Sequence, residues 1–409
     1  MDLASLKDRL RQEVEARTDV LLDASHQIHD HPELNYEEHF AHDLLTDLLA
    51  GEGVTVERGA YGLPTAFRAV AGSGGPTIAV LCEYDALPGL GHACGHNISA
   101  TAGLGAGLAA AAVAEEVGAR VVILGTPAEE GGGGKILMAR AGAFENVDAA
   151  LMVHPAGFDL ARMDVIAVQE LVATYRGEAA HAAAFPHRGR NALDGAVLGY
   201  LNIAALRQHI LPTERIHGIF TEAGEKPNIV LARAVTEWMV RSPSILSLGP
   251  LKERVLDALQ AGALASGTEL EVAWKPVVYA DMLDNDVMVA LYTANAEALG
   301  RTVLEPDPKL AVVGSTDMVN VSYVVPSIHP MIAAAPAGTP IHTTDFASHS
   351  REPIGDRAVV DGAVAMAWTV ADLWLGDGVL EAVKAEFSGT MDRVGEAARR
   401  SAIDEVARA

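Results

Sequence analysis

Three short apolar runs, each followed by a cluster of polar side chains, constrain the fold of this chain most. They are Thr77–Cys82, Val121–Leu124 and Ala149–Val153. Apolar runs of this length without polar alternation are typical of strands buried on both faces, as in a parallel sheet. In open α/β sheets, ligands bind outside the carboxyl ends of the strands. We therefore expect the polar residues after the three runs to meet at one edge of a sheet.

Each of these clusters contains side chains that bind metals or transfer protons. The first run leads into Glu83-Tyr84-Asp85-Ala86-Leu87-Pro88 and His92-Ala93-Cys94-Gly95-His96, the second into Glu129-Glu130, and the third into His154-Pro155. Thiolate, imidazole and carboxylate groups are the usual ligands of zinc and similar ions. Their expected convergence predicts the site of a metal-dependent hydrolase.

Composition argues against several classes of partner. The 409 residues include 30 basic and 54 acidic ones, which gives a formal net charge of −24. This charge argues against nucleic acid and anionic membranes as partners. The uncharged segment Ile98–Ala114 is rich in Ala and Gly and follows a dense polar motif, so it is interpreted as a buried helix rather than a membrane span. The chain opens without a signal-like segment, and its two cysteines make no disulfide framework, so a cytoplasmic location is expected.

The pattern of elements predicts one domain interrupted by another. Strands alternate with helices up to about residue 165 and again after Pro276, which is typical of βαβ units. Between them, the order β-α-β-β-α-β is that of a ferredoxin-like module. We expect an α/β domain, with a mixed and mostly parallel sheet flanked by helices, over 1–168 and 279–409. A ferredoxin-like α+β domain is expected over 169–278.

Cys94 and His96 stand two residues apart at the start of the predicted helix. A helix N-terminus favours the ionised thiol, and the surrounding glycines permit a tight loop. A Cys-x-His pair alone is a weak signal, because it can equally be a buried thiol beside a surface histidine. Glu129 and Glu130 could divide two roles, one binding a metal and one acting as general base, although paired acids are usually part of a solvated surface.

Histidines elsewhere in the chain are weaker candidates. A lone histidine at a strand end, such as His154, is more often structural than a ligand. Among the later histidines, His342 in Pro340-Ile341-His342-Thr343-Thr344 competes with His329 and His349 on the residues alone. The inserted domain carries three further polar candidates, His181, Asn228 and Arg241, which could contact a carbonyl or a carboxylate. From the residues alone, an ordinary solvated surface is the preferred interpretation of these three.

These segments together resemble the binuclear metallopeptidase family of aminoacylases, dipeptidases, carboxypeptidases and plant indole-acetyl-amino-acid hydrolases. The resemblance covers essentially the whole chain, from Ile28-His29-Asp30-His31-Pro32-Glu33-Leu34 to His342. It is closest to the branch of p-aminobenzoyl-glutamate hydrolase and the β-alanyl-lysine dipeptidases, over Tyr84–Asn97, Gly125–Lys135 and Gly314–Ser322. The resemblance implies a catalytic domain, a ferredoxin-like lid that also forms a homodimer, and two divalent metal ions per subunit, Zn²⁺ or Mn²⁺.

By motif position, the resemblance also implies roles for individual residues. Glu129 would be the general base, Asp85 would orient a metal ligand, and His181 would reach the partner subunit's site. Asn228 and Arg241 would contact substrate. The implied metal ligands are Cys94, His96, Glu130, His154 and His342. Two positions depart from the pattern: Glu83 replaces a His ligand of many members, which implies the Cys-containing ligand set, and Asn97 replaces an Asp common in the plant hydrolases.

The expected reaction is hydrolysis of an amide in an N-acyl amino acid or a small dipeptide-like substrate, similar to p-aminobenzoyl-glutamate. Glu129 would take a proton from the attacking water and return it to the leaving amine, with His181 helping to stabilise the oxyanion. One alternative is an aminopeptidase or dipeptidase that requires a free amino terminus. Another is a non-catalytic binding protein on the same fold, since a fold does not guarantee activity.

Overall fold

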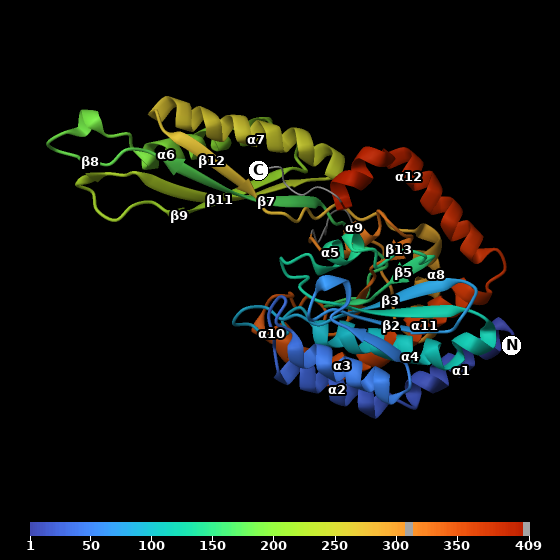
Figure 1. The fold of residues 1–409 in the computed structure, drawn as a ribbon. Helices are drawn as coiled ribbons and strands as arrows, with labels where there is room; N and C mark the ends of the chain where they lie inside the picture. Colours follow the sequence, from blue (N-terminus) through green and yellow to red (C-terminus); the bar gives the residue numbers. More distant parts are fainter. Residues whose placement is uncertain (307–313, 404–409) are drawn as a thin grey trace. The chain divides into compact units, whose positions relative to one another are not determined.

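The computed structural model divides the chain into two compact units (Figure 1). The first comprises Met1–Asp164 and Met282–Gly395, and the second Val165–Asp281 with the end of the chain. Residues 1–306 and 314–403 are described. The helix α12 (Val379–Ile403) is interrupted at Gly395, where φ is 80°. Since this break lets the chain turn, the segment after it belongs to the second unit, whereas the sequence pattern assigns all of 279–409 to the first.

A six-stranded sheet forms the centre of the first unit, in the order β1-β2-β4-β3-β5-β13. Neighbours among β4, β3, β5 and β13 are parallel, whereas β1 and β2 are antiparallel additions. A separate parallel pair joins β6 to β14. The strands are β1 (Thr55–Arg58), β2 (Phe67–Ala71), β3 (Thr77–Glu83), β4 (Arg120–Thr126), β5 (Ala149–Leu151), β6 (His154–Ala156), β13 (Ser327–Ile328) and β14 (Met331–Ala333).

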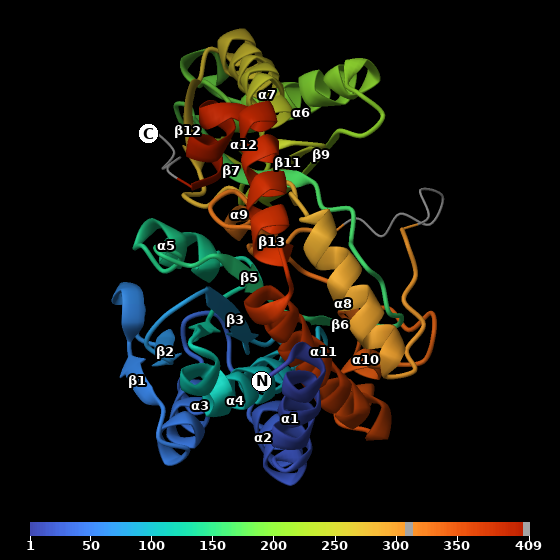
Figure 2. The same ribbon diagram turned by 90° about the vertical axis from the view of Figure 1, so that its right-hand side faces the viewer.

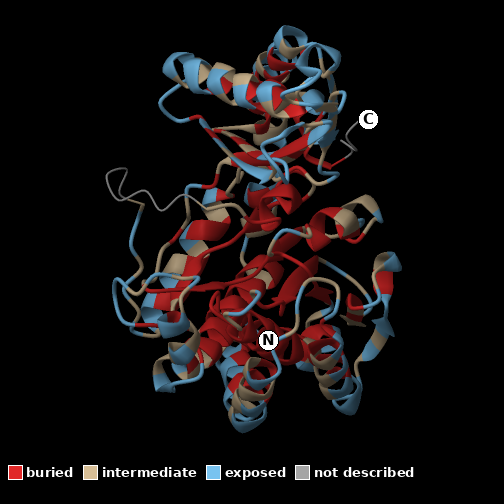
Figure 3. Ribbon diagram, turned by 90° about the vertical axis from the view of Figure 1, so that its left-hand side faces the viewer, coloured by how far each residue is buried: buried red, intermediate tan, exposed pale blue. Residues whose placement is uncertain are grey.

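Both faces of this sheet are buried, which explains the continuous apolar runs in the sequence (Figure 3). Along β3, Ile78 and Val80 belong to one hydrophobic core, while Ala79 and Leu81 belong to another. Because successive side chains of a strand point to opposite faces, the two cores lie on opposite sides of the sheet. The three apolar runs are the adjacent parallel strands β4, β3 and β5, as predicted.

Helices surround this sheet (Figure 2). Two of them, α4 and α11, are apolar and long enough to cross a membrane, but 89% and 78% of their most apolar windows are buried inside the fold. A Cβ atom on Gly103 of α4 would lie 2.4 Å from the carbonyl oxygen of Leu81, so small residues let this helix pack directly on β3. The helices of this unit are α1 (Leu3–Glu15), α2 (Thr18–Asp30), α3 (His39–Gly51), α4 (His96–Val117), α5 (Gly134–Arg140), α8 (Asp286–Ala298), α9 (Met318–Val321), α10 (Thr344–His349), α11 (Pro353–Leu375) and the first part of α12.

The second unit contains an antiparallel four-stranded sheet, in the order β12-β7-β11-β9, with the helices α6 and α7. The chain order is the predicted β-α-β-β-α-β. One predicted strand, Asn228–Val240, is wrong as a single element: Leu231 and Ala232 accept hydrogen bonds from Ala192 and Gly177, which separates β10 from β11. The elements are β7 (Ala167–Arg176), β8 (Ala180–His181), α6 (Ala192–Leu206), β9 (Arg215–Glu222), β10 (Ile229–Val230), β11 (Arg233–Ser242), α7 (Ile245–Ser266) and β12 (Glu269–Trp274).

Candidate metal centre

The polar residues that follow β3, β4 and β5 meet at the carboxyl ends of these strands. A tight loop before α4 carries Cys94 into this group, and Gly95 adopts a φ of 75° there. A Cβ atom at this position would lie 2.8 Å from Pro155 and 3.2 Å from Phe346. Glycine is therefore required where the loop passes the turn that follows His154.

Cys94 lies at the centre of the cluster. Its Sγ atom is 3.4 Å from Nε2 of His154 and 3.5 Å from Nε2 of His342. Two groups of potential ligands share this thiol, Cys94-His96-His154 and Cys94-Glu130-His342, and within each group the ligand atoms lie within 4.8 Å of one another. Ligand atoms about 2.0–2.3 Å from one tetrahedral metal ion are roughly 3.3–3.6 Å apart. The residues therefore fit two metal ions with one thiolate common to both.

Asp85 holds two of these ligands from the side away from the cluster. Its carbonyl oxygen is 2.9 Å from Nδ1 of His96, and its Oδ2 atom accepts a hydrogen bond of 2.9 Å from the backbone N–H of Glu130. A carbonyl oxygen can only accept, so we assign the proton of His96 to Nδ1, which leaves Nε2 for a metal. Contacts of this kind fix the tautomer and orientation of a metal ligand, which is the role that the family resemblance implies for Asp85.

Glu129 and Glu130 are adjacent but stand in different surroundings. Burial, reinforced by the charges of Glu83 and Glu130, raises the pKa of Glu129 well above its usual value. Burial also acts to raise the pKa of Glu130, but the hydrogen bond from His342 and the charge of His96 bring it below its usual value. Glu130 is thus suited to remain a carboxylate ligand, and Glu129 to take up and release a proton.

The three late histidines occupy different environments. Nε2 of His342 lies 3.3 Å from Oε1 of Glu130, and its backbone N–H donates to the carbonyl of Ala93 at 2.8 Å. His342 has a φ of 61°, a conformation that is uncommon for residues other than glycine and is often found at functional sites. His329 is buried with its ring centroid 5.3 Å from that of His154, outside both ligand groups, and His349 contacts Glu352 at 2.7 Å. The structure therefore places His342 at the cluster.

His154 has the electrical state that a metal ligand needs. Burial lowers the pKa of His154 to about 4, so the imidazole is neutral near pH 7. Neutral imidazole is the form that binds metal ions. His96 differs, because the charge of Glu83 overcomes the effect of burial and raises the pKa of His96 well above its usual value. A cation bound at Nε2 of His96 would have to replace a proton there.

The structure adds two site neighbours that sequence reasoning missed, Lys135 and Asp317. Both side chains are fully buried, and Lys135 forms ion pairs with Asp317 and with Glu83. The sequence offered a partial signal, since both residues lie in stretches that resemble the p-aminobenzoyl-glutamate hydrolase branch. However, no spacing rule connects two residues that are 182 positions apart.

The candidate substrate residues of the second unit do not form one group within a single chain. His181 and Asn228 are exposed neighbours, because His181 pairs with Ile229 and the N–H of Ala182 donates to the carbonyl of Asn228 at 3.1 Å. Arg241 is half-buried on β11, eight residues from the start of that strand next to β10. This separation corresponds to about 26 Å of extended strand.

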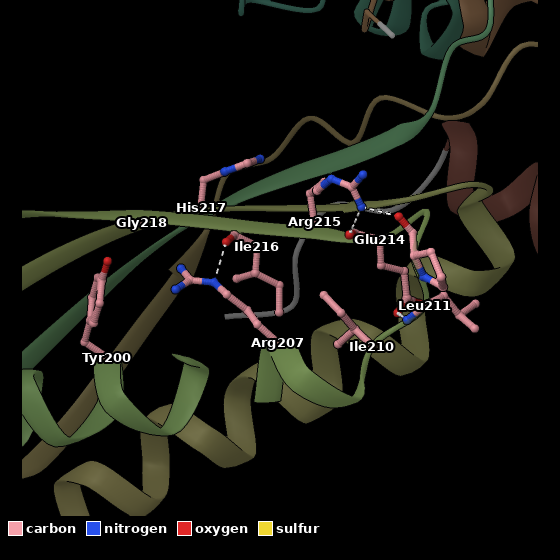
Figure 4. Close-up of a pocket in the computed structure, with 10 residues that line it drawn as sticks. Tyr200, Arg207, Ile210, Leu211, Glu214, Arg215, Ile216, His217 and Gly218 are labelled. Atoms are coloured by element: carbon pink, nitrogen blue, oxygen red, sulfur yellow. Dashed lines mark hydrogen bonds between the residues drawn. The ribbon is translucent and has the colours of Figure 1, made fainter. Parts of the chain in front are cut away.

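A pocket in the second unit lies between the end of α6 and the start of β9 (Figure 4). Its lining includes Tyr200, Arg207 in the short 3₁₀ helix η3 (Arg207–His209), and His217. Nε of Arg207 donates to the carbonyl of Ile216 at 2.9 Å, so this side chain is held against β9. The residues that line the pocket include none of the predicted site residues, and the candidate active site is therefore the cluster around Cys94.

Comparison with known proteins identifies the family. Residues 80–358 match the model of the peptidase family M20/M25/M40. The chain belongs to this family. It is 39% identical to the Xaa-Arg dipeptidase of Mus musculus over 403 residues, which cover 94% of this chain and 93% of the relative. It is 30% identical to one of the two p-aminobenzoyl-glutamate hydrolase polypeptides of Escherichia coli (strain K12) over 452 residues, which cover 93% of this chain and 94% of the relative.

Solved structures show the same M20 fold. A dinuclear metal-binding peptidase of this family from Bacillus subtilis matches with a TM-score of 0.66 and 18% identity, over 87% of this chain and 98% of that one. The family and its fold confirm the α/β architecture predicted from the sequence. They also confirm the resemblance to metallopeptidases. The protein is a metal-dependent peptidase or amidohydrolase of the M20 family.

Proposed function

We propose that this M20 enzyme hydrolyses the amide bond of a small dipeptide or N-acyl amino acid at a centre of two divalent metal ions, Zn²⁺ or Mn²⁺. The observation that carries the proposal is the sharing of Cys94 between two ligand groups, with Glu129 beside them. The two curated relatives support the substrate class, since one is named for Xaa-Arg dipeptides and the other for p-aminobenzoyl-glutamate.

The residues of the centre divide the work of the reaction. Cys94, His96 and His154 would hold one ion, and Cys94, Glu130 and His342 the other. Bound divalent ions polarise a carbonyl group and lower the pKa of water. Glu129 takes the proton of the attacking water and delivers it to the leaving amine, for which its buried position and raised pKa suit it. Asp85 keeps His96 and Glu130 in place during both proton transfers.

The substrate class is tested with three compounds and each metal: a dipeptide ending in Arg, its N-acetylated form, and p-aminobenzoyl-glutamate. We expect kcat/KM for the free dipeptide to exceed that for p-aminobenzoyl-glutamate by at least ~10-fold, the discrimination that a modest side-chain difference gives. This order follows the higher identity to the dipeptidase. Activity on the N-acetylated dipeptide would show that a free amino terminus is not needed, and its loss would favour the free-terminus alternative. No hydrolysis of any compound with either metal would contradict the proposal.

A homodimer formed through the second unit is also part of this proposal. β9 is an edge strand of its sheet, with Ile219 and Phe220 exposed by 62% and 36%. Phe220 stacks on Tyr200 of α6, and the same helix exposes Leu201 by 56%. An exposed apolar edge favours association, whereas the opposite edge, β12, carries exposed Glu269 and other charges that discourage it. A two-fold related copy packed on β9 and α6 would cover the apolar side chains.

The proposed dimer lets His181 serve the partner subunit's site, and mixing two inactive variants tests this. We expect Glu129→Gln and His181→Ala to be nearly inactive alone, and a mixture with verified subunit exchange to regain up to about half of the wild-type activity per mixed dimer. The reason is that one of its two sites then combines an intact Glu129 with an intact His181. The absence of regained activity would contradict the role of His181, and a monomer by sedimentation would contradict the dimer.

A further inference from the structure

Three charged side chains that take no part in the reaction above form a buried network beside the centre. Glu83 ends β3, Lys135 is the second residue of α5, and Asp317 precedes α9. All three side chains have 0% exposure. Nζ of Lys135 contacts Oε2 of Glu83 and lies 2.7 Å from Oδ1 of Asp317. Buried charges are tolerated only when they are paired, so each of the three side chains is held in one orientation.

Asp317 fixes Lys135 by its backbone as well as by its side chain. Its Oδ2 atom accepts a hydrogen bond of 2.7 Å from the backbone N–H of Lys135, while Oδ1 contacts the ammonium group of the same residue. This double contact sets both the start of α5 and the position of Nζ. The ammonium group is therefore a rigid point against which one oxygen of Glu83 is held.

The other oxygen of Glu83 is directed at His96. Oε1 of Glu83 lies 3.0 Å from Nε2 of His96, but the two atoms do not meet with the geometry of a hydrogen bond. Neither has a hydrogen-bond partner among the residues that the structure describes. Nδ1 of His96 is already directed at the carbonyl oxygen of Asp85, 2.9 Å away. Two buried atoms with lone pairs thus lie side by side, at a separation close to that of two ligands on one metal ion.

We propose that Oε1 of Glu83 is a sixth protein ligand of the metal centre and that Lys135 is the residue that positions it, by holding Oε2. The inference rests on the two-metal centre proposed above. It gives the ion at Cys94, His96 and His154 a fourth protein ligand, the number found in tetrahedral sites without an open position. The group of Cys94, Glu130 and His342 has three, which leaves a position open. The ion on the His96 side is therefore expected to bind more tightly.

Substitution of Glu83 by Gln tests the proposal on the full chain. We expect apo wild-type protein dialysed against buffered Zn²⁺ to take up two ions, counted by mass spectrometry of the metal. In Glu83→Gln we expect the affinity for one ion to fall by at least ~10-fold, the lower end of the range for altered groups around a metal site. Gln keeps the volume of the side chain and can still accept a hydrogen bond from Lys135, and thermal unfolding verifies that the variant folds.

Asp372→Asn is a matched control within the same unit. Asp372 is also a buried carboxylate that holds a lysine ammonium, that of Lys7 at 2.7 Å, but it belongs to neither ligand group. The control is expected to lower the melting temperature without changing the affinity for Zn²⁺. If Glu83→Gln binds both ions with wild-type affinity, the inference is wrong and the two-metal centre stands. If wild-type protein takes up no ions, the proposed centre itself fails.

Cobalt absorption gives a second readout that does not depend on a variant. In wild-type protein loaded with a single equivalent of Co²⁺, the ion is expected to occupy the position with four protein ligands. Azide should then leave the cobalt spectrum unchanged, because the coordination sphere is closed. A spectrum that changes as azide binds would show an open position at that ion and would overturn the role of Glu83.

Discussion

Replacing Glu129 with Gln is expected to lower kcat by at least ~100-fold, the usual scale for the loss of a general base. The amide cannot take up the proton of the attacking water, although it fills the same space. Glu129 is 5% exposed, so solvent is poorly placed to act as a substitute base. Because Glu129 is not the carboxylate paired with His342, the variant should keep its two metal ions.

Steady-state kinetics on the best of the three test compounds, together with a count of bound metal, provides the measurement. Glu130→Gln is the natural control, since it changes the neighbouring carboxylate, whose Oε1 lies 3.3 Å from Nε2 of His342. That variant should lose activity together with metal. Near-native turnover in Glu129→Gln would remove Glu129 from the reaction.

The second large effect is expected at Cys94. Replacing Cys94 with Ala removes the side chain that the two ligand groups share, so the affinity for both ions should fall together. The fall should be at least ~100-fold, at or above the top of the range measured for groups that only support a ligand. Hydrolysis should be lost to the same extent.

His154→Ala separates a shared ligand from an unshared one. His154 belongs to one ligand group and lies 3.4 Å from Sγ of Cys94, so its removal should weaken one ion and spare the other. Calorimetric titration of both apo variants with Zn²⁺ distinguishes the two outcomes. If Cys94→Ala loses a single ion, the thiol serves one metal position and the geometry of the centre must be revised.

Much of the fold could be predicted because its physical causes are local. Strands buried on both faces carry continuous apolar runs, and this pattern identified β3, β4 and β5 as parallel neighbours. The order of elements in the second unit followed in the same way. The separation of β10 from β11 could not be predicted, because it depends on hydrogen bonds from Ala192 and Gly177, about 40 and 55 positions earlier in the chain.

The site was predictable in proportion to how local its contacts are. Cys94 and His96 lie two positions apart, and the strand ends that bring Glu130 and His154 to them could be recognised. His342 could not be chosen over His329 or His349 from the residues, since the decisive contact spans 248 positions. Lys135 and Asp317 escaped notice for the same reason, because an ion pair between distant residues leaves no spacing in the sequence.

The split of the first unit across the chain has a consequence for its synthesis. Cys94, His96 and His154 are all made before the second unit, whereas His342 follows it, 248 residues after Cys94. At about 5–20 residues per second, the ribosome needs roughly 12–50 seconds to cover that interval. A nascent chain at this stage already carries one complete ligand group and lacks the other. One metal position is thus available before the second exists, and a catalytic pair of ions can form only after the later part of the first unit has emerged.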